Sequence, residues 1–152
     1  MIKEPKTSFS RWKPAALRDS TTSDDPLFPI PKGFDVSGIY LLARFKNKRE
    51  RENNKDGQLH LNPNVVYIGE SKEITRRLEG SRHEKIREYK KVFNDHSLKC
   101  LYFSECHVGW TTSDFQERDS ARVRKAYLLY LESKLIWEFA KAYSTLPHLN
   151  RK

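Results

Sequence analysis

The chain has little cysteine and no long apolar run. Its two cysteines, Cys100 and Cys106, are too few for a disulfide framework, and their spacing is not that of a zinc pair. We therefore expect a reduced, cytoplasmic setting. No apolar stretch approaches the ~20 residues of a membrane span, so no membrane partner is expected. Residues 1–13 also lack the apolar region of a secretory signal.

What the chain does have is positive charge. Its 152 residues include 29 lysines and arginines against 20 aspartates and glutamates, a formal net charge of +9. That length suits one compact domain with its own core. The basic excess favours a polyanionic partner, nucleic acid before membrane. A soluble protein that is merely basic is the alternative.

Proline content and hydrophobic periodicity divide the chain into an N-terminal arm and a domain. Residues 1–35 carry five of the seven prolines and show no sustained periodicity. We expect an irregular arm there that wraps the domain or stays mobile, with Trp12 among the apolar side chains able to dock. From residue 36 to 152 the periodicity of folded elements takes over. A charged stretch at 46–64 cannot form core and is expected as a hairpin insertion.

The domain is expected to be α+β. Alternating apolar residues predict strands, and apolar residues at helical spacing predict helices. The predicted strands are 36–45, 65–68 and 98–104, and the predicted helices are 74–93, interrupted at Gly80, and 119–143. This order, β-β-α-β-α, indicates a small three-stranded antiparallel sheet flanked by helices.

Two charged residues lie where apolar side chains are expected. Glu132 falls inside the apolar stripe of the last helix, where a carboxylate needs a metal, an arginine or a set of donors. A structural ion pair would satisfy it equally well. Arg77, between Ile74 and Leu78, suits a phosphate or a carboxylate, although an arginine at a helix margin also commonly extends to solvent.

Two tyrosines lie in neighbouring strands. Tyr40 and Tyr67 could each be a core aromatic, but next to a metal and an arginine a phenol can lose enough proton affinity to act as a base. His83 is another candidate base, or an exposed histidine on a basic helix. His107, beside Cys106, is expected at the surface, with Cys106 a buried thiol.

These residues fall in an ordered set of motifs. The motifs are Gly38-Ile39-Tyr40, Tyr67-Ile68-Gly69, Arg77-Leu78, Glu132-x-x-Leu135-Ile136 and Pro147-x-x-Asn150. In this the chain resembles a GIY-YIG nuclease domain, from about Gly38 to Asn150. Each tripeptide alone is a weak signal, whereas five motifs in register are a strong one.

The resemblance implies hydrolysis of DNA phosphodiester bonds with a divalent cation, Mg²⁺ or Mn²⁺, held by Glu132. It implies that Arg77 neutralises the phosphate, that Asn150 fixes local geometry, and that a tyrosine helps deprotonate water. Tyr40 is favoured for that step, with Tyr67 holding water or phosphate. The chain departs from the family pattern at Ser81, where many members carry histidine or tyrosine. It departs again at Glu70, where repair-type members favour lysine.

Several basic residues are expected to contact DNA. They are Lys72, Arg76, Arg82 and Lys85, with the charged loop at 46–55 as a candidate for groove contact. The leading hypothesis is a compact endonuclease of restriction, phage or mobile-element type, acting as a monomer or homodimer. A non-catalytic nucleic-acid-binding module is the alternative. A domain that binds an acidic protein partner is the third possibility.

Overall fold

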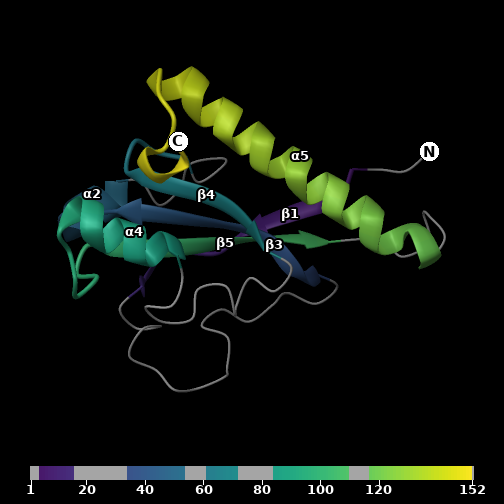
Figure 1. Ribbon diagram of the computed structural model, residues 1–152, viewed down its shortest axis with the longest axis horizontal. Helices are drawn as coiled ribbons and strands as arrows, with labels where there is room; N and C mark the ends of the chain where they lie inside the picture. Colours follow the sequence, from purple (N-terminus) through teal and green to yellow (C-terminus); the bar gives the residue numbers. More distant parts are fainter. Residues whose placement is uncertain (1–3, 16–33, 54–60, 72–83, 110–116, 152) are drawn as a thin grey trace.

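The computed structural model describes residues 4–15, 34–53, 61–71, 84–109 and 117–151, drawn as ribbon in Figure 1. The elements are β1 (Lys6–Phe9), β2 (Lys13–Pro14), β3 (Phe34–Arg44), α2 (Lys48–Asn53), β4 (Val65–Ser71), α4 (Glu84–Phe93), β5 (Leu101–Gly109), α5 (Glu117–Tyr143) and the 3-10 turn η2 (His148–Asn150). Within these ranges, no helix is both long and apolar enough to cross a lipid bilayer.

The strands form one antiparallel sheet in the order β1-β5-β3-β4, with β2 also paired to β5. The α+β class and the antiparallel pairing of the first two predicted strands are confirmed. From β3 onward the predicted order of elements is present, with the short helix α2 added inside the charged insertion. β4 ends the sheet, so its outer edge has no strand neighbour among the described residues.

The sheet has five strands rather than the predicted three. The added strands, β1 and β2, come from the segment predicted to be irregular, and that prediction is wrong for residues 6–9 and 13–14. Both strands are short, and Pro14 lies in the second, so their sequence carries no readable alternation. Docking of Trp12 is confirmed, because its buried ring packs edge-on against Phe45 with centroids 5.5 Å apart. Residues 16–33 of the predicted arm lie outside the described residues.

The two faces of the sheet carry separate apolar clusters. Ile39 and Leu41 of β3 pack with α5 in one cluster, whereas Tyr40 and Leu42 pack with α4 in the other. Successive strand residues point to opposite faces, so the alternation in the sequence sorts these side chains between the two helices. The sheet is thereby covered on both sides, as Figure 1 shows for the long α5.

β5 extends further than predicted and changes the interpretation of His107. The side chains of Glu105 and His107 are 3% and 2% exposed, and their Oε2 and Nε2 atoms lie 3.0 Å apart. The prediction of a surface histidine is therefore wrong. Cys106 points to the opposite face, where it is buried as predicted and burial raises the pKa of its thiol to about 12. Adjacent strand residues on opposite faces cannot share one metal ion.

We predict that His107→Phe destabilises the fold by roughly 3–5 kcal/mol, because it leaves the Glu105 carboxylate buried without its partner. The double variant Glu105→Leu/His107→Phe should recover most of that loss, since it removes both polar groups together. Urea denaturation at neutral pH measures both. A single variant as stable as the wild type would show that the two side chains do not depend on each other.

Candidate active site

The two motif tyrosines meet at a glycine. Tyr40 in β3 is the register partner of Gly69 in β4, and the rings of Tyr40 and Tyr67 lie 5.6 Å apart between centroids. A Cβ on Gly69 would lie 2.6 Å from Cε1 of Tyr67 and 2.8 Å from the Tyr40 hydroxyl oxygen. No side chain fits at that distance. Gly69 is therefore needed for both phenols to occupy this end of the strand pair.

Glycine is needed at position 38 for a different reason. A Cβ there would lie 2.3 Å from the carbonyl oxygen of Cys106 in β5. Close approach of a neighbouring backbone is one of the uses of glycine in a strand. The first motif glycine thus lets β5 run close beside β3, and the second makes room for the phenols.

Tyr67 borders a cavity of about 430 Å³ beside β4. The other lining residues come from α4, α5, the loop after it and η2: Glu84, Lys85, Glu132, Ile136, Leu146, Leu149 and Asn150. Tyr40 is not among them and is 1% exposed. The ammonium of Lys85 lies 5.0 Å from the centroid of the Tyr67 ring. The cavity thus has one phenol at its wall, with the second packed against that phenol.

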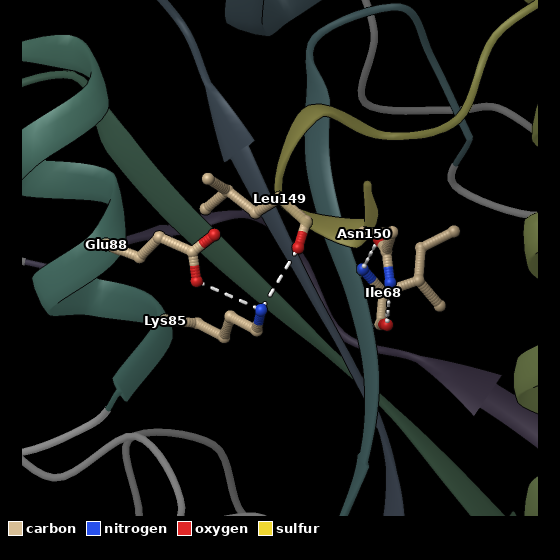
Figure 2. Close-up of polar contacts among 5 residues, drawn as sticks. All are labelled: Ile68, Lys85, Glu88, Leu149 and Asn150. Carbon is tan, nitrogen blue, oxygen red and sulfur yellow. Dashed lines mark hydrogen bonds and ion pairs between the residues drawn. The ribbon is translucent and has the colours of Figure 1, made fainter. Parts of the chain in front are cut away.

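Asn150 binds the outer edge of β4, as Figure 2 shows. Its Oδ1 accepts a 2.9 Å hydrogen bond from the backbone N–H of Ile68, and its Nδ2 donates a 3.0 Å bond to the Ile68 carbonyl. The amide therefore supplies the two bonds that a neighbouring strand would make. It joins the end of the chain to the residue between Tyr67 and Gly69.

Glu132 reaches the same edge from α5. Its side chain is half-buried at the cavity wall, and the backbone N–H of Glu70 donates to its carboxylate. Burial raises the pKa of Glu132, and the nearby charge of Glu70 raises it further, against the opposing effects of that hydrogen bond and of Lys125. The carboxylate is thus held in place by β4 in an environment that disfavours its negative charge.

Lys85 links α4 to η2. Its Nζ lies 3.0 Å from Oε2 of Glu88 and donates a 3.1 Å hydrogen bond to the Leu149 carbonyl, both visible in Figure 2. The side chain is mostly buried. These contacts give Lys85 a structural role at the cavity wall, and its predicted contact with DNA stays a prediction.

The structure brings Tyr40, Tyr67, Glu132 and Asn150 together around β4. The predicted residues Lys72, Arg76, Arg77, Arg82 and His83 lie outside the described residues. Within the described ranges, no group of three or more histidine, cysteine, aspartate or glutamate side chains is arranged to hold a metal ion.

Sequence reasoning placed Lys125 on the basic surface of the last helix and missed its ion pair with Glu70. Lys125 in α5 forms an ion pair with Glu70 directly beside Glu132. Glu70 stood out in the sequence only as a departure from the lysine of repair-type members. Lys125 lies seven residues before Glu132, two turns along the same face of the helix, which is the signal that could have linked them.

We predict that Asn150→Ala lowers the free energy of unfolding by about 1–3 kcal/mol, because it leaves the N–H and carbonyl of Ile68 unpaired at the strand edge. Asn150→Asp should also destabilise, since a carboxylate cannot donate to that carbonyl. The exposed neighbour His148, changed to alanine, controls for other effects in the same turn. Equal loss in all three variants would mean that the amide has no special role.

Comparisons with known proteins identify no relative of this chain. The chain matches no protein-family model, and neither curated proteins nor solved structures give a significant match. The likeness to GIY-YIG nucleases therefore depends on the motif residues alone, and the activity that it implies is a proposal.

Proposed function

We propose that the protein is a divalent-metal-dependent endonuclease that hydrolyses DNA phosphodiester bonds at the cavity beside β4. One observation carries the proposal. Tyr67, Glu132 and Asn150 border the same cavity, and Asn150 is bonded there to Ile68, 82 residues earlier in the sequence. Tyr40 packs directly behind the Tyr67 phenol. Asn150 and Glu132 also bond the backbone of β4, so the same side chains cover the strand edge and border the cavity.

The residues at this edge fit a hard divalent cation. Mg²⁺ prefers oxygen ligands and is commonly held by one or two carboxylates while keeping several waters. Glu132 presents a half-buried carboxylate at the cavity. Next to it, Oε2 of Glu70 is buried and has no hydrogen-bond partner among the described residues. We therefore assign Glu132 as the residue that holds Mg²⁺ or Mn²⁺. Such a cation would polarise the phosphate and favour departure of the leaving oxygen.

The two phenols take different roles. Tyr67 borders the cavity, so we assign it contact with the attacking water. Tyr40, buried and packed on Tyr67, is assigned to hold that phenol in place. This reverses the preference for Tyr40 as the base, because a side chain 1% exposed cannot meet a water in the cavity without rearrangement.

Asn150 acts on the site through the backbone. By binding both polar groups of Ile68 it keeps the strand edge at a constant distance from η2. Small displacements of groups that position reacting atoms can cost large factors in rate. Asn150 is therefore assigned a positioning role and no direct contact with substrate.

Net charge supports a polyanionic substrate. With a formal charge of +9, the chain attracts DNA without regard to sequence, and that attraction weakens with added salt. The same charge is compatible with binding alone. Cutting and binding must therefore be measured separately.

We predict that the wild-type protein nicks supercoiled plasmid in the presence of Mg²⁺ and not in the presence of chelator. Glu132→Gln should lower the nicking rate on the order of 10²-fold or more, because it removes the carboxylate proposed to hold the cation while keeping its shape. Gel electrophoresis of the plasmid over time measures the rate. Fluorescence anisotropy with labelled duplex measures binding, which should change little.

Glu138→Gln is the matched control. Glu138 lies on α5 and pairs with Lys141 at 3.0 Å, away from the residues that line the cavity. It should cut like the wild type. Binding without cutting by the wild-type protein would favour the non-catalytic nucleic-acid-binding alternative. Normal cutting by Glu132→Gln would remove Glu132 from the mechanism.

A further inference from the structure

The outer side of α5 carries two exposed aromatic rings. α5 lies across one face of the sheet, so one side of the helix is turned away from the sheet (Figure 1). Leu128, Leu131 and Leu135 of α5 are buried, whereas Tyr130 and Trp137 are 52% and 61% exposed. Tryptophan is highly buried on average. Large exposed rings that are grouped rather than scattered mark a surface that meets a partner.

The two rings lie on one line along the helix. They are seven residues apart, which is two turns and places them about 10.5 Å from each other on the same face. Residues three and four positions away are the neighbours of a side chain on a helix surface. For Tyr130 and Trp137 these neighbours are two lysines, three small residues and one tyrosine: Ala126, Tyr127, Ser133, Lys134, Ala140 and Lys141. None of them is acidic.

These neighbours decide what the rings present. The small side chains leave the flat faces of the rings accessible, and the lysines put positive charge beside them. The ammonium of Lys141 lies 5.7 Å from the centroid of the Trp137 ring, although it also pairs with Glu138 at 3.0 Å. Lys134 lies between the two rings in the sequence and is half-buried. The face thus combines planar apolar groups with cations.

The charges favour one kind of partner. A second copy packed through the same face would bring Lys134 and Lys141 of two chains together, each chain with a formal charge of +9. An acidic peptide would meet the lysines, but a carboxylate side chain has no flat face for the rings. A nucleic-acid strand with unpaired bases offers both a π-face for each ring and a phosphate for each lysine.

We propose that the outer side of α5 binds single-stranded DNA by stacking unpaired bases on Tyr130 and Trp137, with phosphates at Lys134 and Lys141. The distance between the rings equals about three nucleotide steps of roughly 3.4 Å, so one strand reaches both. Neither ring lines the cavity beside β4. The surface is therefore separate from the proposed catalytic site. Only the choice of DNA over RNA rests on the proposed function.

The test is the fluorescence anisotropy of labelled oligothymidylate of about 12 nucleotides, titrated with the full chain in chelator so that no strand is cut. Tyr130→Ala and Trp137→Ala should each weaken binding about fivefold or more, because each removes one stacked base. Trp137→Phe should lose less, because it keeps a ring. Both side chains are exposed, so the midpoint of urea denaturation should not move.

Leu129→Ala is the matched control. Leu129 is 47% exposed on the same helix, and its loss removes exposed apolar area but no ring. Its binding should stay within about twofold of the wild type. An abasic strand of equal length keeps the phosphates and lacks the bases, so the wild type should bind it more weakly and the ring variants should bind it equally. Lys134→Gln and Lys141→Gln should each reduce the salt slope by about 0.7, which the ring variants leave unchanged.

The other occupants of this face give different results. Equal affinity of the wild type and both alanine variants for oligothymidylate overturns the proposal, as does an equal loss on the abasic strand. Binding of poly-glutamate that falls as much in these variants would assign the face to an acidic protein. A dimer of the full chain that Trp137→Ala separates, measured by sedimentation equilibrium without DNA, would assign it to a second copy. Either result overturns the proposal.

The outcomes also separate this surface from the proposed nuclease. Tighter binding of oligouridylate than of oligodeoxyuridylate, which differ only in the sugar, would overturn the choice of DNA. Failure of the ring variants to affect binding leaves plasmid nicking, and with it the proposed function, standing. Absence of nicking by the wild type overturns the proposed function, whereas ring-dependent binding of oligothymidylate would still support this surface.

Discussion

The outer edge of β4 is the constraint on which the site depends. A strand at the end of a sheet presents backbone donors and acceptors that must be paired, hydrated or covered. Here Asn150 pairs with Ile68, and Glu132 accepts the N–H of Glu70, two residues further along the same edge. Side chains from the end of the chain and from α5 thus complete β4. The side chains that cover this edge, Asn150 and Glu132, are also among the residues that line the cavity.

The packing of β4 on β3, and of β3 on β5, depends on close approach at two glycines. Gly69 leaves room for the phenols of Tyr40 and Tyr67, and Gly38 lets the backbone of β5 pass close to β3. Glycine in a strand normally weakens it. Two glycines at the same end of the strand pair are therefore tolerated because they permit contacts that no side chain would allow. The tripeptides are structural requirements whichever chemistry the phenols perform.

The parts of the fold that periodicity describes could be predicted from the sequence. β3, β4 and α5 have strong alternation or helical spacing, and their observed limits lie close to the expected ones. β1 and β2 could not be predicted, because strands of four and two residues carry too little pattern. They are stable only through pairing with β5, and that pairing crosses most of the chain.

The sequence named the residues of the candidate site but did not predict the contacts that they make. Tyr40, Tyr67, Glu132 and Asn150 were named by their motifs, which resemble those of GIY-YIG nucleases, but no local rule predicts that Asn150 binds Ile68 across 82 residues. The sequence also did not predict which polar side chains are buried. Glu105 and His107 appear in the sequence as polar residues at the end of a strand, yet tertiary packing covers both. Contacts made at long range decide such cases, because polarity alone sets only a preference for water.

The charges of the described residues at the cavity bear on the proposed cation. The chain carries a formal charge of +9, yet Glu132 and Glu84 line the cavity beside β4 and Glu70 lies next to them. A phosphate entering this cavity would meet carboxylates in a protein that otherwise attracts it. Lys85 and Lys125 offset part of that charge, but their ammonium groups already contact Leu149 and Glu70 respectively. If a polyanionic substrate reacts in this cavity, as proposed, the described carboxylates would oppose its entry unless positive charge were supplied there. The divalent cation proposed for this site would supply such charge.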